Sequence, residues 1–211
     1  MQYLVFVAAF VACYIFGAIP FGVIVGKVTR GVDIRSFGSG NIGFANVLRT
    51  LGPGPGLAVF LLDTGKGLAA VELCRWLGMN DYLTVVGGVL SLVGHCFSVF
   101  LKFQGGRAVA TSLGMMVGLT PVIAGIAFVL WVLLVGITRY ISVASILAAL
   151  SVSAMVLLWK PHIPVPYQVV AVMATALIVL KHTSNIRRLM NGTESKVGQR
   201  VKLESKEGED G

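Results

Sequence analysis

The sequence predicts an all-α polytopic membrane protein with seven transmembrane helices, its N-terminus outside and its C-terminus in the cytoplasm. Of its 211 residues, 56% are hydrophobic and 12% are charged, and the mean hydropathy is +0.86. Soluble domains are about one-quarter charged, so this composition excludes an ordinary soluble fold. Several uncharged runs approach or exceed the ~20 residues that a helix needs to cross a bilayer. We therefore expect one seven-helix membrane domain over residues 1–203 and a polar, disordered tail over residues 204–211.

The predicted spans follow the uncharged runs and the breaks between them. Residues 1–26 have no basic residue ahead of the apolar run and no clear cleavage site, which favours a retained first helix over a signal peptide. Residues 108–138 are uncharged, but Thr120-Pro121 divides them into two helices, because proline disfavours a helix through the preceding residue. The alternative is one long tilted helix. The predicted spans are 3–26, 54–75, 82–101, 108–120, 121–138, 142–159 and 166–181.

Basic residues are distributed unevenly between the two sides of this arrangement. With the N-terminus outside, 14 of the 17 lysines and arginines fall in cytoplasmic connections or in the C-terminal segment, as the positive-inside rule requires. They are Lys27, Arg30, Arg35, Arg49, Lys102, Arg107, Arg139, Lys181, Arg187, Arg188, Lys196, Arg200, Lys202 and Lys206. The net charge of +8 is therefore partly an insertion signal, and since no nucleic-acid-binding motif is present we expect no nucleic-acid partner.

The sequence gives no sign of a metal or cofactor site. Its three cysteines lie in or near apolar segments without CxxC spacing, so we expect buried, inert thiols. No cluster of Asp and Glu residues is available for Mg²⁺, no G-x-S-x-G motif occurs, and no aspartate stands five residues after a histidine. An enzyme with this composition would have to bind anions with arginine, lysine and backbone N–H groups, and would use an already activated substrate.

Residues 36–52, SFGSGNIGFANVLRTLG, form the first of three polar segments on the predicted cytoplasmic side. Glycines alternate with Ser39 and Asn41, and an amphipathic stretch follows that includes Arg49. Glycines allow backbone N–H groups to turn toward one point, and the hydroxyl, amide and guanidinium groups add donors. The segment can therefore bind an oxyanion or phosphate without a metal. The alternative is a flexible re-entrant turn with an arginine that marks topology.

The second polar segment, residues 94–114, contains Lys102, Gly105, Gly106 and Arg107 directly before an uncharged run. A glycine pair that opens a helix would present free N–H groups at the positive end of the helix dipole, and the basic residues would reinforce that attraction. The segment therefore predicts an anion site, most simply for a phosphate. The alternative is a basic pair that marks the membrane boundary.

The third polar segment, residues 181–198, contains His182 and Asn185. If the last helix continues, these side chains lie on one face because they are three residues apart. His182 could then act as a base at neutral pH, with Asn185 orienting the imidazole or a substrate hydroxyl. The alternative is a plain helix-end histidine. For His95, near the end of the third span, we expect a packing role.

Charged and hydroxyl side chains near the ends of the spans give weaker signals. Asp63 and Lys66 lie three residues apart within the second span, which favours a structural ion pair over a proton path because the opposite charge is already at hand. Arg139 and Ser142 at the predicted cytoplasmic boundary could line the same site as the three segments. Glu194 is expected to pair with a basic neighbour.

Together the three segments resemble the signature regions of the PlsY family, the bacterial acyl-phosphate:glycerol-3-phosphate acyltransferases. The resemblance covers about Tyr14 to Gly198 and keeps three motifs in order on one side of the membrane. The matching residues are Ser39-Gly40-Asn41-Ile42-Gly43 with Asn46-Val47-Leu48-Arg49, Gly94-His95 with Val99-Phe100-Leu101-Lys102-Phe103 and Gly105-Gly106, and His182 with Asn185-Ile186 and Arg188-Leu189. Family members are seven-span proteins, so the resemblance implies a multi-pass protein of the bacterial cytoplasmic (inner) membrane whose active site faces the cytoplasm.

The resemblance also implies a reaction. A fatty acyl group passes from acyl phosphate to the 1-hydroxyl of sn-glycerol 3-phosphate, giving lysophosphatidate and phosphate, the first acylation of bacterial phospholipid synthesis. The implied partners are these two substrates and membrane lipid, with no metal, no cofactor and no obligatory protein partner. The implied catalytic residues are Ser39, Arg49, His182 and Asn185. The residues expected to bind substrate are Gly40, Asn41, Lys102, Gly105, Gly106, Arg107, Arg139, Ser142 and Arg188.

This chain departs from the family pattern in the second and first motifs. The family loop reads K-G-G-K-G, whereas here Gln104 and Arg107 replace the lysines and Ala108 replaces the last glycine; Phe44-Ala45 replaces Ala-Thr. An arginine keeps the charge but presents a planar fork, so its pose on a phosphate can differ. Two routes stay open for the hydroxyl proton, which passes either to His182 or to the departing phosphate.

A small transporter of organic phosphates is the alternative from another functional class. Such a protein would use the same basic pocket but would also have a matching outer vestibule and often an inverted repeat. The outer connections here carry few charged residues, and no repeat is evident. The sequence therefore favours an acyltransferase.

Overall fold

The computed structural model describes residues 1–159 and 162–199, so the predicted tail lies outside the described residues. The described residues form helices and no strand. The elements are α1 (Gln2–Ala18), α2 (Phe21–Arg30), η1 (Ile34–Ser36), α3 (Phe44–Leu51), α4 (Pro53–Trp76), α5 (Asp81–Cys96), η2 (Val99–Leu101), α6 (Val109–Leu119), α7 (Pro121–Thr138), α8 (Ile141–Leu158), α9 (Val165–Lys181) and α10 (Thr183–Met190), where η marks a 3-10 helix.

Five predicted spans each correspond to a single helix: 54–75, 108–120, 121–138, 142–159 and 166–181. α4, α6, α7, α8 and α9 each begin and end within one residue of the predicted ranges. The division at Thr120-Pro121 is confirmed, because α6 ends at Leu119 and Pro121 is the first residue of α7. A proline fits that position because its missing N–H would have no partner in the first turn.

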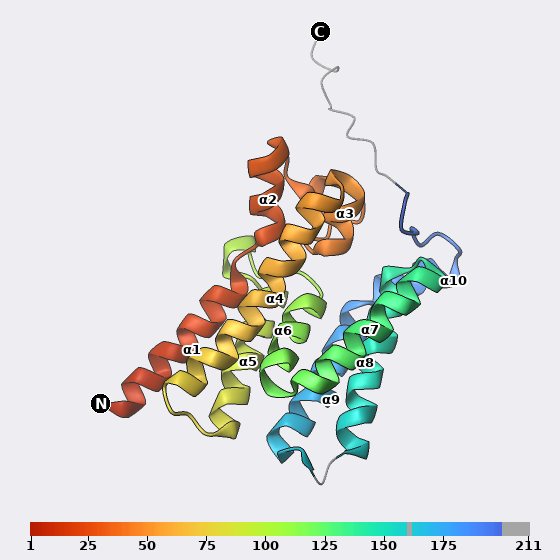
Figure 1. The fold of residues 1–211 in the computed structure, drawn as a ribbon. Coiled ribbons are helices and arrows are strands. Elements are labelled where there is room, and N and C mark those ends of the chain that lie inside the picture. The colour runs from red at the N-terminus through yellow and green to blue at the C-terminus, as the bar shows by residue number, and fades with distance from the viewer. Residues whose placement is uncertain (160–161, 200–211) are drawn as a thin grey trace.

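The first predicted span, 3–26, is wrong as a single helix. α1 and α2 meet at Ile19-Pro20 with a bend of 43°, since proline cannot donate a backbone hydrogen bond and its ring clashes with the preceding turn. Gly22, just after the bend, lies against the carbonyl of Ile42, which any side chain at this position would overlap. α2 therefore turns away from α1 and rests on the loop before α3 (Figure 1).

The last predicted span, 166–181, is followed by a second bend. α9 and α10 differ in direction by 52°, and His182 lies at the bend between them rather than on a helix face. The predicted span 82–101 is similarly divided, because α5 ends at Cys96 and η2 completes the segment. Both breaks lie next to the polar segments singled out in the sequence.

Three segments of the described chain are long and apolar enough to cross a membrane: Asp81–Leu101, α7 and α8. The number rises to five if each bent pair, α1 with α2 and α9 with α10, counts as one span. The predicted spans in α4 and α6 do not meet this criterion of length and apolar composition. α4 has 24 residues but carries Asp63, Lys66, Glu72 and Arg75, and α6 has only 11 residues.

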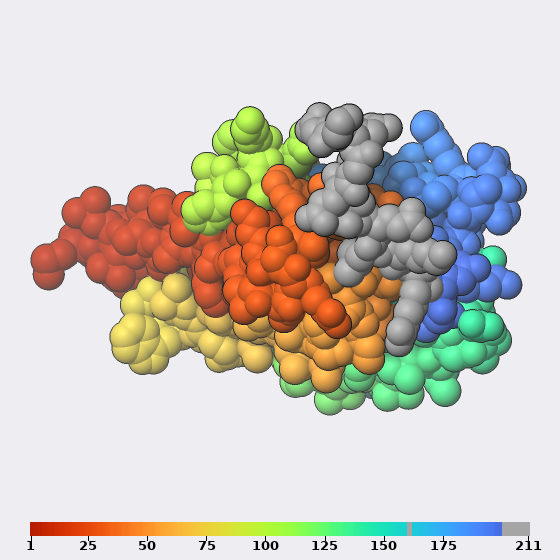
Figure 2. Space-filling view, turned by 90° about the horizontal axis from the view of Figure 1, so that it is seen from above, coloured from red at the N-terminus to blue at the C-terminus, as the bar shows by residue number. Residues whose placement is uncertain are grey.

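The helices form two groups that meet along α6 (Figure 1). α1, α4 and α5 pack together in one group, in which α4 and α5 contact α6, and α7, α8 and α9 form the other. α2, α3 and α10 lie at one end of this bundle, opposite the N-terminus (Figure 1). Figure 2 views the molecule from that end and shows three segments on the same face: α2 with α3 in orange, the segment near residue 100 in yellow-green, and the segment after α9 in blue.

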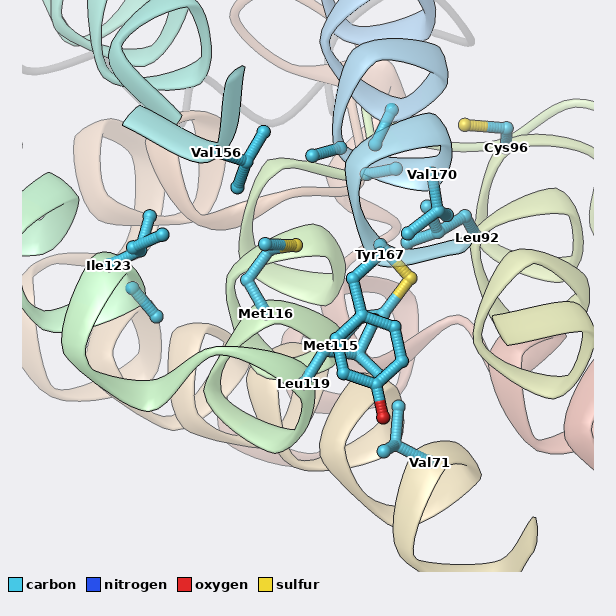
Figure 3. Packing of buried hydrophobic residues seen from close by; sticks show 14 residues of the cluster. Val71, Leu92, Cys96, Met115, Met116, Leu119, Ile123, Val156, Tyr167 and Val170 are labelled. Carbon is cyan, nitrogen blue, oxygen red and sulfur yellow. The ribbon is translucent and has the colours of Figure 1, made fainter. Parts of the chain in front are cut away.

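The main apolar core lies where the two groups meet. Figure 3 shows Met115 and Met116 of α6 between side chains of α4, α8 and α9, including Val71, Val156 and Val170. α4 and α6 approach so closely that a side chain at Gly114 would overlap the carbonyl of Thr64. This packing places the ends of both helix groups, and the polar segments attached to them, around a shared space.

Candidate active site

Two adjoining cavities lie where α3, the loop before α6 and α10 come together. We call the cavity that is lined by more residues the larger cavity, and its neighbour the smaller cavity. The polar lining of the larger cavity includes Asn41, Arg49, Arg107, His182, Asn185 and Glu194, and side chains from α6 to α9 make the rest largely apolar. The smaller cavity is lined by Arg35, Ser39, Gly40, Gly105, Gly106 and Lys181, among others. Asn41 and Arg107 line both cavities, so the two spaces meet at these residues.

The first polar segment is a loop organised by a buried asparagine. The side-chain amide of Asn46 donates to the carbonyls of Ile34 at 3.2 Å and Phe37 at 3.1 Å, and its Oδ1 accepts from the backbone N–H of Ser39 at 2.9 Å. Gly40 has φ +69°, a conformation that glycine adopts without strain. Ser39 itself is exposed and lines the smaller cavity rather than the larger one that contains His182.

The second polar segment does not open a helix as predicted. α6 begins at Val109, and the backbone N–H of Gly106 donates to the carbonyl of His95 at 3.0 Å, so it is not free for an anion. The glycines serve close approach instead. A side chain at Gly105 would overlap the carbonyl of His95, and one at Gly106 would overlap Nε2 of the same histidine. This loop delivers Arg107 to the boundary between the cavities.

The third polar segment converges on Glu194, which is buried. Its Oε1 accepts from Ser142 Oγ and Asn185 Nδ2, and its Oε2 accepts from Arg188 Nε, each at 2.7 Å. Burial alone would raise the pKa of Glu194, but these three hydrogen bonds outweigh it and the pKa is lowered. The predicted pairing of Glu194 with a basic neighbour is therefore confirmed. Arg188 and Ser142 thus hold the carboxylate that in turn holds Asn185.

His182 lies at the bend before α10 with one ring nitrogen occupied. Its Nδ1 is 2.7 Å from the carbonyl oxygen of Ile178, which can only accept, so Nδ1 carries the proton in the neutral ring. Nε2 is then the acceptor nitrogen. Asn185 also contributes to the cavity lining, and its Oδ1 is buried without a hydrogen-bond partner among the described residues.

Arg49 and Arg107 are half-buried cations that the Glu194 carboxylate attracts without direct contact. Within residues 1–159 and 162–199, neither guanidinium forms a hydrogen bond or an ion pair with the protein. Burial lowers the pKa of Arg107 to about 10 and also lowers the pKa of Arg49, yet both remain protonated near neutral pH. Two desolvated positive charges on one cavity favour a bound anion, because such charges are otherwise costly.

Two predicted substrate-binding residues lie elsewhere. Lys102 is exposed at the end of η2 and lines neither cavity. Arg139 lines neither, because α7 ends there in a left-handed turn and the Arg139 guanidinium donates to the carbonyl of Val197 at 2.8 Å. The other predicted residues line one or both cavities, except Arg188. Arg188 instead donates a hydrogen bond to Glu194, which lines the larger cavity.

Sequence reasoning missed several residues of the site. Arg35 and Lys181 line the smaller cavity, and Asp63 and His95 contribute to the larger one. His95 and Lys181 lie within the second and third polar segments and Arg35 directly precedes the first, which was the available signal, whereas Asp63 reaches the site only through helix packing. No group of three His, Cys, Asp or Glu side chains suited to a metal occurs in the described part of the chain.

Comparisons with known proteins identify the family of this chain. The family model described as "Glycerol-3-phosphate acyltransferase" matches residues 7–192. Curated relatives of that name include proteins from Synechococcus sp., 40% identical over 90% of this chain and 94% of the relative, and from Desulforudis audaxviator, 43% identical over 87% and 91%. The glycerol 3-phosphate form of PlsY, an integral membrane glycerol 3-phosphate acyltransferase, is 36% identical with a TM-score of 0.85 over 92% of this chain and 96% of that one. A lysophosphatidic acid form of PlsY matches with a TM-score of 0.80. These matches favour an acyltransferase over the transporter alternative, and this multi-pass membrane protein belongs to the glycerol-3-phosphate acyltransferase family.

Proposed function

We propose that this chain transfers a fatty acyl group from acyl phosphate to the 1-hydroxyl of sn-glycerol 3-phosphate, giving lysophosphatidate and inorganic phosphate. The observation that carries the proposal is the pair of half-buried, unpaired guanidiniums of Arg49 and Arg107 on one cavity. Both substrates are phosphates, which repel one another unless fixed positive charge is present. A cavity that is basic at one end and apolar over much of its lining suits a reaction between a soluble phosphate and a lipid-like donor.

The two cavities divide the substrates between them. The smaller, polar cavity binds the phosphate of glycerol 3-phosphate through Arg107 and Lys181. The larger cavity takes the acyl phosphate, with its chain along the apolar side chains of α6 to α9 and its phosphate near Arg49. Arg107 and Asn41, which line both, bring the hydroxyl and the acyl carbonyl together, so that a bimolecular step becomes effectively unimolecular.

The chemical step then needs one proton acceptor. The 1-hydroxyl oxygen attacks the acyl carbonyl carbon, a new C–O bond forms, and the bond to the phosphate oxygen breaks with its electron pair. His182 accepts the hydroxyl proton at Nε2, since Nδ1 is held by Ile178, and Asn185 and Ser39 position the substrate. The rival version gives the proton to the leaving phosphate. A His182→Ala variant that keeps more than about a tenth of the parent rate excludes His182 as the base, because a general base contributes ~100-fold or more.

The membrane arrangement belongs to the same proposal. One domain over residues 1–203 crosses the bacterial inner membrane seven times, with the N-terminus outside and the two cavities facing the cytoplasm. The proposal is supported by the gathering of α2, α3 and α10 at one end of the bundle, since these elements carry predicted cytoplasmic basic residues. α4 counts as a span because Asp63 and Lys66 are buried and paired, and α6 because it lies among other helices.

Phosphate release tests the proposed reaction directly. Purified protein in lipid receives palmitoyl phosphate with and without glycerol 3-phosphate, and palmitoyl-CoA serves as the control donor. We expect inorganic phosphate only when both palmitoyl phosphate and glycerol 3-phosphate are present. Silence from folded protein with both, or equal turnover with palmitoyl-CoA, contradicts the proposal.

A further inference from the structure

A buried polar group lies behind the loop that carries Arg107. Asp63 and Lys66 of α4 and His95 of α5 are each no more than 4% exposed. Lys66 Nζ lies 2.9 Å from Asp63 Oδ1, which confirms the predicted ion pair, and His95 Nδ1 lies 3.6 Å from the same oxygen. Lys66 also donates to the carbonyl of Ile19 at 3.1 Å, at the bend between α1 and α2. We call Asp63, Lys66 and His95 the buried triad.

The buried triad touches the glycine loop through His95. Gly106 donates its N–H to the His95 carbonyl at 3.0 Å, and the Gly106 backbone lies so close to the imidazole that any side chain there would overlap Nε2. At Gly105 a side chain would overlap the His95 carbonyl. The glycine loop therefore packs directly on one histidine, which agrees with the packing role expected for His95.

Retention of this polar group inside the bundle requires a physical reason. Buried ion pairs contribute little or nothing to stability compared with apolar side chains of the same size, because both charges lose their hydration. His95 Nδ1 has no aligned hydrogen bond among the described residues, and the carboxylate of Asp63 is the charge beside it. A polar oxygen beside one ring nitrogen favours the ring orientation that turns this nitrogen toward it.

We propose that His95, oriented by the Asp63–Lys66 ion pair, is a positioning residue that fixes Gly105, Gly106 and Arg107 for the binding of glycerol 3-phosphate. The inference rests on the proposed function, because it deepens the assignment of the smaller cavity to that substrate. A loop held in its binding conformation before the substrate arrives loses less entropy on binding. Loss of the ring therefore weakens binding of glycerol 3-phosphate more than binding of the acyl donor, because Gly105, Gly106 and Arg107 line the smaller cavity, whereas His95 is one of many residues along the larger one.

The first test removes the ring. In a His95→Ala variant we expect the KM for glycerol 3-phosphate to rise about tenfold, while the KM for palmitoyl phosphate and kcat change by less than about threefold. The matched control is Ser91→Ala, a buried polar residue one turn earlier on α5 whose neighbours are in α1. Equal changes in both KM values, or none in folded His95→Ala protein, overturn the proposal.

The second test asks whether loop and ring act through the same contact. Gly106→Ala forces a methyl group into the imidazole, so it raises the KM for glycerol 3-phosphate on its own. If the methyl group meets the His95 ring, the double variant that combines Gly106→Ala with His95→Ala removes the overlap. Its KM for glycerol 3-phosphate is then no higher than that of Gly106→Ala alone. Effects that multiply instead show two independent sites and contradict the proposal.

The third test separates charge from orientation. Asp63→Asn with Lys66→Met leaves no unpaired charge and keeps a hydrogen-bonding group beside His95, so we expect a KM for glycerol 3-phosphate within about threefold of the parent. Asp63→Leu with Lys66→Met has similar bulk but no such group, and should match His95→Ala. If the two double variants behave alike, the orienting role of Asp63 is wrong. This pair decides the question even if His95→Ala fails to fold.

Calorimetric binding of glycerol 3-phosphate without any donor distinguishes failure of this inference from failure of the proposed function. A parent protein that binds glycerol 3-phosphate but releases no phosphate contradicts the proposed reaction, and weaker binding by His95→Ala still supports the positioning role. A parent that turns over normally, together with a His95→Ala variant of unchanged affinity, contradicts the positioning role alone.

Discussion

At the scale of residues, the site depends on which cations lack a partner. Arg35 is paired with Asp33 at 2.6 Å and Arg188 with Glu194 at 2.7 Å, whereas Arg49 and Arg107 have no such partner in the described part of the chain. An unpaired, partly desolvated guanidinium interacts strongly with an incoming phosphate because water competes less. The same residue type therefore has different roles at these positions.

Arg107 provides the clearest residue-scale prediction. Arg107→Ala should lower kcat/KM for glycerol 3-phosphate about 100-fold, since a charge-assisted, partly buried contact is worth roughly 2–3 kcal/mol. Arg107→Lys should recover part of that loss, because charge remains but the bidentate fork does not. The control is Arg30→Ala at the exposed end of α2, which should change the value less than twofold. A comparable loss from Arg30→Ala would point to general charge rather than to the cavity.

The lowered pKa of Glu194 predicts that the stability of the folded protein depends on pH. Its pKa is lowered in the folded protein, so it stabilises the fold at pH above its ordinary value of 4.5, and that contribution is lost as the pH falls through the folded value. Glu194→Gln should reduce the melting temperature in detergent at pH 7, and the difference from the parent should narrow as the pH falls below 4.5. A gap that is independent of pH would show that the carboxylate charge is not what stabilises the segment.

At the scale of elements, four aromatic side chains connect the two helix groups beside the larger cavity. The rings of Phe44 of α3 and Phe60 of α4 meet edge to face with their centroids 5.6 Å apart, and the ring centroid of Trp131 of α7 lies 6.1 Å from that of Phe44. Phe128 of α7 stacks on Phe60 at 5.9 Å, and Trp131 donates to Ser145 Oγ at 3.1 Å. All four aromatics contribute to the cavity lining.

Removal of this contact should affect the acyl donor. Trp131→Ala is expected to raise the KM for palmitoyl phosphate by about fivefold or more and to leave the KM for glycerol 3-phosphate within about twofold, because the ring buries apolar surface beside the chain. Trp76→Ala is the matched control, since Trp76 is 83% exposed at the end of α4. Steady-state kinetics with each substrate varied in turn decide the matter, and the reverse pattern would contradict the assignment of the larger cavity.

Close packing of α4 and α6 gives a second element-scale prediction. A methyl group at Gly114 overlaps the Thr64 carbonyl, so Gly114→Ala should lower the melting temperature clearly. Gly125 of α7 has nothing within 4 Å of such a methyl group, and Gly125→Ala should be neutral or raise stability by up to about 1 kcal/mol through helix propensity. Similar melting temperatures for both variants in the same detergent would contradict the close approach.

At the scale of the whole molecule, the proposed topology places the cavities on the cytoplasmic side. A chain without its native cysteines can carry a single cysteine at Lys102 or at Asn80, which are exposed at opposite ends of the segment formed by α5 and η2. In intact spheroplasts a membrane-impermeant maleimide should label Asn80→Cys, whereas Lys102→Cys should require permeabilisation. Labelling of Lys102→Cys from outside would reverse the orientation.

The sequence by itself determined the helical membrane class, most helix limits and three polar segments in order. These features are local, because the length of an uncharged run, a Thr-Pro step or a glycine-rich motif acts over a few residues. Only the tertiary structure decided that Gly106 rests on His95, that Asp63 contributes to the cavity, that Lys102 and Arg139 lie outside it, and that α9 bends at His182. Each of these depends on contacts between segments far apart in the chain, and a single sequence contains no direct signal for such contacts. Hydrophobic patterning selects which segments enter the membrane, whereas packing between helices selects which charges remain unpaired at the site.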